Sequence, residues 1–290
     1  MVKLDFEKVY DSLDHTFLYN ILSEIGFRWK WRQWISNCIS SPMLSVLVNG
    51  SPTRQFRMER GLRQGDPLSL FLFNVAVEGL SALFKKTETM DLMKGVSFGT
   101  KAVHVSHLQL ADDTMLFLQS REDYLLNVRR ILRCYEVALG LRINFHKSCV
   151  VQIGKGGETE VNWAAIFKCV KGTLPISYLG LPLGGHPCSK LFWNDLIQRI
   201  ENCCVRRKPH AIKWETMCKS KDNGGLGIDS VLDKNKGMLA KWAWRFGKEE
   251  SSLWKRVMCA KYGVSLNSLK WKWNGGSTSS YFIKGVGVLL

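Results

Sequence analysis

The stretch QLADDTMLF, residues 109–117, places two carboxylates, Asp112 and Asp113, between apolar residues typical of β-strands. Adjacent carboxylates repel each other, and each is costly to remove from water. In a continuous strand their side chains would point to opposite faces, so they could not form one compact pair. The simplest interpretation is the turn of a β-hairpin, because Asp is a common turn residue. The alternative is a pair of functional carboxylates at the end of a strand.

A third carboxylate, Asp5, lies in the short predicted strand VKLDF near the start of the sequence. Asp5 stands between Leu4 and Phe6, so its side chain projects to the face opposite those two. If this strand pairs beside the hairpin, Asp5 and Asp112 can meet across neighbouring strands. Carboxylates that converge at a sheet edge need positive charge, and divalent metal ions supply it. Paired Mg²⁺ ions held by such oxygens serve phosphoryl transfer, where the attacking and the leaving oxygen both need stabilisation.

Hydrophobic periodicity and turn residues predict alternating strands and helices around these carboxylates. The expected elements are, in order, a strand over 2–6, helices over roughly 15–25 and 29–40, a hairpin turning at Asn49–Gly50, a long apolar helix capped by Asp66 and started by Pro67, the hairpin around the Asp pair, a helix over 121–139 ended by Gly140, a strand over 141–153, and a glycine-rich hairpin or turn over 176–185. This order predicts an α+β fold, with helices packed on one face of an antiparallel sheet. After about residue 204 the pattern changes to basic, Trp-rich helical stretches.

The composition is that of an ordinary globular chain, with 46% hydrophobic and 23% charged residues, which excludes a mainly disordered polypeptide. The longest apolar run, over 68–84, is short for a bilayer span and contains Asn74 and Glu78, so we expect a buried helix and no membrane association. The sequence is charged from Lys3 onward, unlike a secretory signal. Nine cysteines without a C-x-x-C pair indicate reduced thiols. We therefore expect an intracellular protein, nuclear or cytoplasmic, that is not secreted.

Positive charge is concentrated toward the end of the sequence. The formal net charge is +16, and residues 205–290 hold 17 Lys and Arg against 6 Asp and Glu, a difference of +11. Such an excess favours a polyanionic partner, most often nucleic acid, although a solvated basic surface is the plain alternative. Six of the 11 tryptophans also fall in this region. They could stack on bases, or they could pack inward as part of a small core.

Five sequence blocks, in order, resemble the successive motifs of reverse transcriptases, in particular those of plant LINE-type (non-LTR) retrotransposons. The blocks are LDFEKVYD, GLRQGDPLS, LQLADDTMLF, GLRINFHKS and YLGLPLGG. The resemblance covers about residues 1–204 as a polymerase palm. It continues over 205–262, where IKWETMCKSKDNGGLGI and LAKWAWRFG are similar to the family's downstream region. Intron-encoded maturases share similar blocks, but GGLGI followed by KWAWRFG favours the retrotransposon.

The resemblance implies an RNA-directed DNA polymerase that uses an RNA template, a DNA primer and deoxynucleoside triphosphates. By this resemblance Asp5 and Asp112 would hold two Mg²⁺ ions, with Asp113 assisting nearby and Mn²⁺ as the alternative ion. The metals would activate the primer 3′-hydroxyl and neutralise the triphosphate and its leaving pyrophosphate. For Asp5, the alternative is a surface acid at a strand end.

Further site residues are also implied by the resemblance. Tyr10 matches the aromatic gate against a ribose 2′-hydroxyl, with an ordinary core tyrosine as the alternative. Gln64 would contact the templating base pair or the incoming nucleotide, and Gly65 would let the backbone approach it. The alternative is a simple helix-entry loop, which Asp66 and Pro67 explain without a ligand. Lys147 matches the lysine that protonates or binds the leaving pyrophosphate, or is a solvent-facing lysine. The hairpin expected to contact the primer supplies Tyr178, Leu179, Gly180, Gly184 and Gly185.

The sequence also departs from the family pattern. We expect a palm-like domain over 1–204, with the fingers absent and most of the thumb deleted between Cys204 and Val205, followed by a basic helical region over 205–290. Val9 replaces the small alanine usual in EKAYD. Because rate depends on holding primer, template and triphosphate in line, we expect the chain alone to be weak or inactive.

Three functions are compatible with these features. The first is the polymerase fragment itself. The second is a non-catalytic nucleic-acid-binding remnant of a retroelement, motivated by the basic tail. The third is the product of a degenerate reading frame without a selected role.

Overall fold

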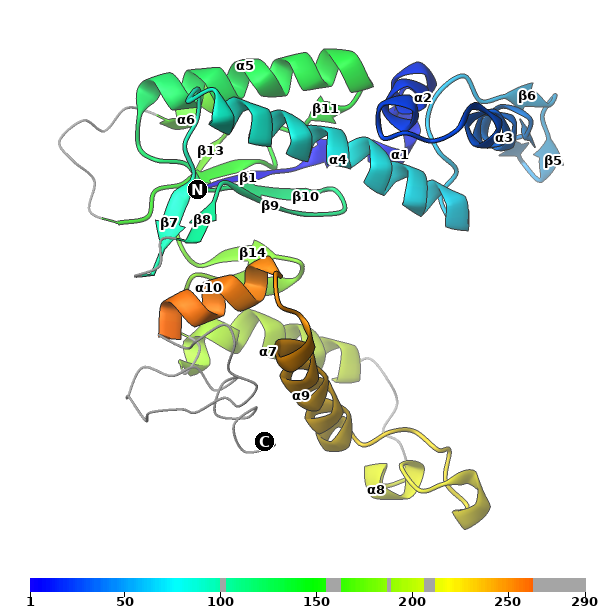
Figure 1. Ribbon diagram of the computed structural model, residues 1–290. Helices are drawn as coiled ribbons and strands as arrows, with labels where there is room; N and C mark the ends of the chain where they lie inside the picture. The colour runs from blue at the N-terminus through cyan, green and yellow to red at the C-terminus, as the bar shows by residue number, and fades with distance from the viewer. Residues whose placement is uncertain (100–102, 155–162, 187–188, 206–211, 263–290) are drawn as a thin grey trace. The chain divides into compact units, whose positions relative to one another are not determined.

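The computed structural model describes residues 1–99, 103–154, 163–186, 189–205 and 212–262 (Figure 1). The chain divides into two compact units. The first comprises Met1–Val96 and Val105–Gly185, and the second comprises Ser97–His104 and the chain from His186 onward. The helix just before residue 205 therefore belongs to the second unit, so the structural division falls earlier than the boundary expected after Cys204.

A five-stranded sheet in the order β13-β12-β1-β10-β9 forms the centre of the first unit. Its strands are β1 (Val2–Leu4), β9 (His107–Leu110), β10 (Asp113–Leu116), β12 (Cys149–Val151) and β13 (Val170–Gly172). All neighbours are antiparallel except β12 and β13, which are parallel. The parallel edge arises because a crossover that includes α6 (Trp163–Phe167) joins these two strands. The expected antiparallel sheet is thus confirmed at its centre, with one parallel pair at its edge.

The remaining strands form two-stranded ladders. They are β2 (Phe6–Glu7) with β11 (Arg142–Ile143), β3 (Met43–Leu44) with β6 (Phe56–Arg57), β4 (Leu47–Val48) with β5 (Ser51–Pro52), β7 (Val96–Phe98) with β8 (Val103–Val105), and β14 (Ile176–Tyr178) with β15 (Leu181–Leu183). The single strand expected over 141–153 is wrong, because a turn over 144–148 separates β11 from β12. The turn redirects the chain from one partner, β2, to another, β1.

Helices of the first unit cover one face of the central sheet, where Figure 1 draws α4, α5 and α6 along the same side of β1, β9 and β10. After the short α1 (Val9–Ser12) come α2 (His15–Glu24), α3 (Trp29–Ser40), α4 (Pro67–Thr89) and α5 (Glu122–Leu139). The shared core is built from fully buried apolar side chains of strands and helices alike, among them Leu4, Leu116, Phe73, Leu80, Leu125 and Leu132. The predicted α+β fold, with helices on one face, is confirmed.

Local sequence signals locate the helix ends. The carboxylate of Asp66 accepts a hydrogen bond from the backbone N–H of Leu68 at 2.9 Å, and Pro67 opens α4, as expected. Helix α5 ends at Gly140, which adopts a φ of +72°. Although α4 is long and apolar enough to cross a membrane, it lines the core with buried residues such as Leu72 and Ala76. It is therefore a core helix, which matches the expectation for this run.

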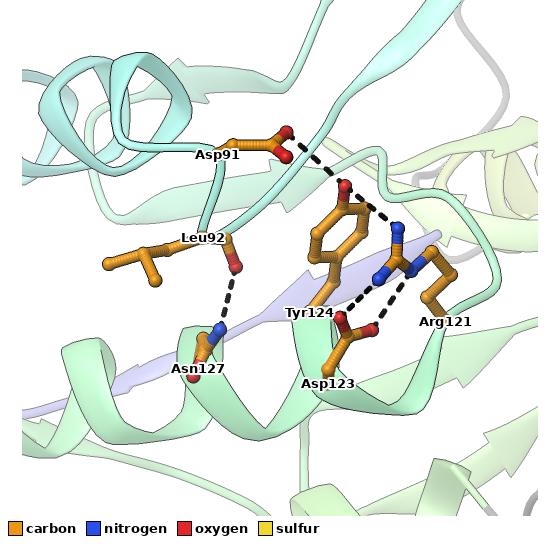
Figure 2. Close-up of polar contacts among 6 residues, drawn as sticks. All are labelled: Asp91, Leu92, Arg121, Asp123, Tyr124 and Asn127. Carbon is orange, nitrogen blue, oxygen red and sulfur yellow. Dashed lines mark hydrogen bonds and ion pairs between the residues drawn. The ribbon is translucent and has the colours of Figure 1, made fainter.

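The end of α4 is fastened to the start of α5 by polar contacts, which Figure 2 shows. The Arg121 guanidinium pairs with the Asp123 carboxylate at 2.6 Å and lies 4.4 Å from the centre of the Tyr124 ring. The Asn127 amide donates to the carbonyl of Leu92 at 2.9 Å, and the Tyr124 hydroxyl donates to Asp91 at 3.4 Å. Two of these contacts, from Tyr124 and Asn127, join the start of α5 to the segment that follows α4.

The second unit is mainly helical in its described part. It contains α7 (Lys190–Val205), α8 (Trp214–Met217), a 3₁₀ turn (η1, Lys221–Asn223), α9 (Val231–Lys248) and α10 (Leu253–Tyr262). The Arg245 guanidinium lies 4.7 Å from the centre of the Trp242 ring and 5.7 Å from that of Trp254, between α9 and α10. Two of the tail tryptophans thus pack around an arginine within this unit. Trp271 and Trp273 lie outside the described residues.

Candidate active site

The carboxylates of the QLADDTMLF stretch lie at one end of the two central strands. Strand β1 runs antiparallel to β10, with Leu4 opposite Thr114, so one further step in the same register brings Asp5 opposite Asp113. Leu4 and Thr114 are fully buried on the helix-covered face. Asp5 and Asp113 therefore point to the other face, where both are half-buried. As expected, Asp5 projects away from Leu4.

The hairpin turn decides which aspartate is the direct neighbour of Asp5. Leu110 pairs with Asp113, so Ala111 and Asp112 form the turn between β9 and β10. Asp113 is consequently the first residue of β10, and Asp112 is exposed at the tip. The register thus places Asp113 opposite Asp5, and Asp112 adjoins the pair from the turn, so the expected meeting of Asp5 with Asp112 stays a prediction.

Electrostatics link the three carboxylates. Burial raises the pKa of Asp113 above its ordinary value, the charge of Lys3 lowers it, and the charges of Asp112 and Asp5 raise it further. The ammonium group of Lys3 lies 4.0 Å from the Asp113 carboxylate, and both side chains are about one-fifth exposed. Lys3 thus pairs with Asp113, whose carboxylate also lies in the field of two further carboxylates.

Lys3 was not recognised as a site residue from the sequence. The two-residue periodicity of a strand could have identified it, because Lys3 stands two positions before Asp5 and both therefore lie on one face. Its ammonium group also donates to the carbonyl of Ser177 in β14 at 3.0 Å. Lys3 therefore joins the carboxylate cluster to the hairpin expected to contact the primer.

That hairpin, β14–β15, turns through Leu179 and Gly180, which both adopt positive φ angles of 51° and 77°. Burial and the charge of Asp113 raise the pKa of the Tyr178 hydroxyl, so this ring lies within the field of the cluster. At Gly184 a Cβ atom would lie 2.4 Å from the side chain of Leu174, and φ is +91°. Gly184 and Gly185 are exposed at the end of the hairpin.

The turn that carries Lys147 is fastened to the backbone of Asp5. The N–H of Asn144 donates to the Asp5 carbonyl at 2.8 Å, and the N–H of Asp5 donates to the hydroxyl of Ser148 at 3.1 Å. Ser148 is 1% exposed, whereas the side chain of Lys147 is exposed. The turn therefore holds Lys147 beside the strand end that carries the first carboxylate. Ser148 is a second residue that sequence reasoning missed, since its role depends on this non-local pairing.

Tyr10 and the loop before α4 form a second part of the site. The N–H of Leu62 donates to the Tyr10 carbonyl at 2.5 Å, and His15 Nε2 lies 2.7 Å from the Gly61 carbonyl. A Cβ atom at Gly61 would lie 2.6 Å from the carbonyl oxygen of Asp11, so only glycine permits this close approach. The Tyr10 ring packs against Phe73 of α4, with 5.2 Å between ring centres. The Tyr10 backbone is therefore hydrogen-bonded to the start of the 61–66 loop, and the Tyr10 ring packs on α4.

Gln64 and Gly65 lie at the exposed tip of that loop. Gly65 has a φ of +88°, and the space where a Cβ would project is open. Glycine is required here by the backbone turn, and nothing in the described part of the protein fills the space beside it. Arg63 and Asp66, paired at 2.7 Å, brace the loop from either side.

The carboxylates fit Mg²⁺ by donor type and by charge, because hard oxygen ligands and excess negative charge are what this ion needs. They do not form a closed cage: across the described ranges, no three His, Cys, Asp or Glu side chains are grouped tightly enough to hold a metal ion. Chemically, the carboxylates offer oxygen donors of the kind that a divalent cation takes, beside the ammonium group of Lys3.

Comparison with known proteins gives a consistent result. The family model described as reverse transcriptase (RNA-dependent DNA polymerase) matches residues 1–183. The retrovirus-related Pol polyprotein from the type-1 retrotransposable element R2 of Popillia japonica is 28% identical over 158 residues, which cover 54% of this chain and 21% of that protein. The transposon TX1 149 kDa protein of Xenopus laevis is 31% identical over 230 residues, which cover 75% of this chain and 16% of that protein.

Among solved structures, telomerase from Candida albicans in complex with a fragment of telomeric RNA aligns with a TM-score of 0.45 and 13% identity. The alignment covers 94% of this chain and 46% of that one. The chain matches about a fifth or less of the length of the two retroelement relatives.

Proposed function

The chain belongs to the reverse transcriptase family, in its non-LTR retrotransposon branch, and on that premise we propose that it carries the catalytic palm for RNA-directed DNA synthesis. The substrates of this proposal are a primed RNA template and deoxynucleoside triphosphates. The observation that carries it is the convergence of Asp5, Asp112 and Asp113 at one end of β1 and β10, with the pKa of Asp113 raised partly by its two neighbours.

Asp5, Asp112 and Asp113 would hold two Mg²⁺ ions, or Mn²⁺ in their place. The ions would stabilise the attacking oxygen and the leaving pyrophosphate together. Asp5 and Asp113 lie on one face of the sheet, and Asp112 adjoins them from the turn between β9 and β10. Lys3 partly neutralises Asp113 when no other cation is near, which limits repulsion within the cluster.

In the proposed reaction the primer 3′-hydroxyl oxygen bonds to the α-phosphorus and loses its proton to solvent water. The bond between that phosphorus and the pyrophosphate oxygen breaks at the same time. The ammonium group of Lys147 would donate a proton to the leaving pyrophosphate or bind its charge. The hydrogen bond from the Asp5 N–H to the Ser148 hydroxyl supports this role, because it keeps the turn that carries Lys147 beside the strand end that bears Asp5.

The Tyr10 ring and the 61–66 loop would position the incoming nucleotide. The Tyr10 ring packs against Phe73 and the Tyr10 backbone is hydrogen-bonded to Leu62, which supports a role of the ring as a barrier to a 2′-hydroxyl. Gln64 and Gly65 would face the nascent base pair from the exposed loop tip. The 176–185 hairpin, tied to the cluster through Lys3, would contact the primer end.

The deciding experiment is Mg²⁺-dependent primer extension by the purified full chain on primed RNA. Extension should disappear in Asp112→Asn, which keeps the size of the side chain and removes its charge. The matched control is Asp123→Asn, which removes a charge in the same unit at the Arg121 pair. Extension by wild type equal to that of Asp112→Asn would end the polymerase proposal for this chain.

The second candidate is a nucleic-acid-binding protein without polymerase activity, favoured by the +11 charge of residues 205–290. It predicts binding that weakens steeply with salt, persists in Asp112→Asn and is lost with the tail. The two candidates separate on extension, because each predicts binding and only the first predicts synthesis.

A further inference from the structure

The first turns of α3 expose three tryptophans in a strongly basic stretch. Trp29, Trp31 and Trp34 are 60%, 47% and 61% exposed. Ile35 is the one buried residue of the helix, so α3 is held to the unit by a narrow strip. Tryptophan carries a large apolar surface that is normally covered, and three exposed rings within six positions need a reason.

The charge of this region restricts what could cover the rings. From Ile25 to Met58 the sequence contains five Lys or Arg and no Asp or Glu. Arg32 is engaged, since its guanidinium lies 5.1 Å from the centre of the Tyr19 ring. The other four, Arg28, Lys30, Arg54 and Arg57, are exposed. A partner must therefore be strongly anionic as well as able to meet flat aromatic faces.

Helix geometry gathers Lys30, Trp31 and Trp34 on one face of α3, whereas Trp29 projects from the other side. Lys30 and Trp34 are four positions apart, and Trp31 and Trp34 are three apart, so these side chains are neighbours on the helix surface. The Trp31 ring is braced by Phe27, with 5.7 Å between ring centres. Directly after α3, the exposed arm of β3–β6 and β4–β5 carries Arg54 and Arg57, and Figure 1 draws it at the same end of the first unit as α3.

We propose that this tryptophan surface, made of Arg28, Lys30, Trp31 and Trp34 and extended by Arg54 and Arg57, binds single-stranded nucleic acid. Unpaired bases stack on the indole rings, and the phosphates pair with the basic side chains. A duplex hides its base faces and lacks this stacking. As a surface for the template strand the inference rests on the proposed function, whereas binding itself is measured without catalysis.

The test measures binding of the full chain to fluorescein-labelled oligonucleotides by anisotropy, in EDTA and without nucleotides. The probes are a uridine-tract RNA of about 20 nucleotides, the matching thymidine-tract DNA and a duplex of equal length. We expect both single strands to bind more tightly than the duplex. The ratio between the RNA and DNA affinities assigns the strand type.

Substitutions at Trp34 test the stacking. Trp34→Ala should weaken single-strand binding by about 5-fold to about 150-fold, the range for one stacked base. Trp34→Phe should retain most of the affinity because it keeps an aromatic face. Trp34→Leu should lose as much as alanine, since it keeps apolar area without a ring face. An unchanged thermal midpoint in all three variants shows that the fold is intact, as the exposure of Trp34 predicts.

Charge is tested with a matched pair of double variants. Arg28→Gln with Lys30→Gln should reduce the slope of log affinity against log salt by about 1.4, because each lost phosphate contact on a single strand contributes about 0.7. Lys85→Gln with Lys86→Gln removes two exposed charges from α4 of the same unit and should leave the slope unchanged. Equal effects of the two pairs would overturn the proposal in favour of diffuse attraction.

Failure of this inference and failure of the polymerase proposal are distinguishable. If wild type extends no primer while binding depends on Trp34, the surface inference is supported and the polymerase proposal is wrong. If extension proceeds while Trp34→Ala and the Arg28/Lys30 variant bind as wild type does, the surface inference is wrong.

Discussion

The hydroxyl of Ser148 accepts a hydrogen bond from the backbone N–H of Asp5 and donates one to the carbonyl of Asn144, at 3.1 Å and 2.8 Å. One buried side chain thus joins the strand end that carries the first carboxylate to the turn that carries Lys147. The same serine ends the interruption between β11 and β12. The geometry of the candidate site therefore depends on a residue outside its charged groups.

Replacing Ser148 with alanine should lower the free energy of unfolding by about 1–3 kcal/mol, because a buried N–H loses its acceptor. Urea unfolding followed by circular dichroism measures the change. Ser177→Ala is the control, since Ser177 is exposed and accepts from Lys3 through its backbone carbonyl, which alanine keeps. Equal losses of unfolding free energy in the two variants would contradict a stabilising role of the Asp5–Ser148 hydrogen bond.

Lys3→Gln should raise the pKa of Asp113 further, because the charge of Lys3 lowers it while Asp112 and Asp5 raise it. A carboxyl-carbon NMR titration of Asp113 reports the shift directly. Lys85→Gln provides a crossed control: Lys85 lowers the pKa of His107, so this variant should raise the pKa of His107 and leave Asp113 unaffected. An unchanged pKa of Asp113 in Lys3→Gln would rule out the pairing of Lys3 with Asp113.

The second unit should lose stability in acid through Glu249. Its carboxylate accepts from Arg245 Nε at 2.5 Å and from Trp254 Nε1 at 2.6 Å, and these bonds lower its pKa from 4.5 to about 2. Since the folded pKa is depressed, this stabilisation is present above pH 4.5 and is lost as the pH falls through about 2. Across this pH range the thermal midpoint should change less with pH in Glu249→Gln than in Glu250→Gln. Glu250 is an exposed neighbour. Identical pH profiles would contradict the assignment.

Tyr135→Phe should be neutral or stabilising, by up to about 1 kcal/mol. Tyr135 is 1% exposed, and its hydroxyl has no hydrogen-bond partner among the described residues. Burial also raises the pKa of this hydroxyl. Tyr124→Phe is the matched comparison on the same helix, because its hydroxyl bonds to Asp91 (Figure 2). It should cost up to about 1 kcal/mol. The reverse order of thermal midpoints would show that Tyr135 is satisfied.

Tyr10→Ala should increase ribonucleotide incorporation relative to deoxyribonucleotides in primer extension, because the barrier to the 2′-hydroxyl is removed. It should also cost about 2 kcal/mol of stability from lost packing against Phe73. Tyr10→Phe keeps the ring and should behave as wild type in both measurements. Unchanged sugar discrimination in Tyr10→Ala would reduce Tyr10 to a packing role.

Features that depend on neighbouring residues were readable from the sequence. The hairpin around Asp112, the Asp66 cap with Pro67, and the α5 helix ended by Gly140 all appear as expected. Each is set by interactions within a few positions: alternation, side-chain capping, or the left-handed backbone that glycine adopts without strain. The five ordered motifs likewise sufficed to indicate the family. The roles of the individual site residues stay predictions.

Features that depend on which strands pair were decided only by the tertiary structure. Alternation determines the face on which Asp5 and Lys3 lie, but the antiparallel register of β1 with β10 determines that Asp113 is their neighbour. The break in the strand expected over 141–153 follows in the same way, since β11 and β12 belong to different ladders. Periodicity is a property of a short segment, whereas register and partner choice result from contacts between residues more than a hundred positions apart.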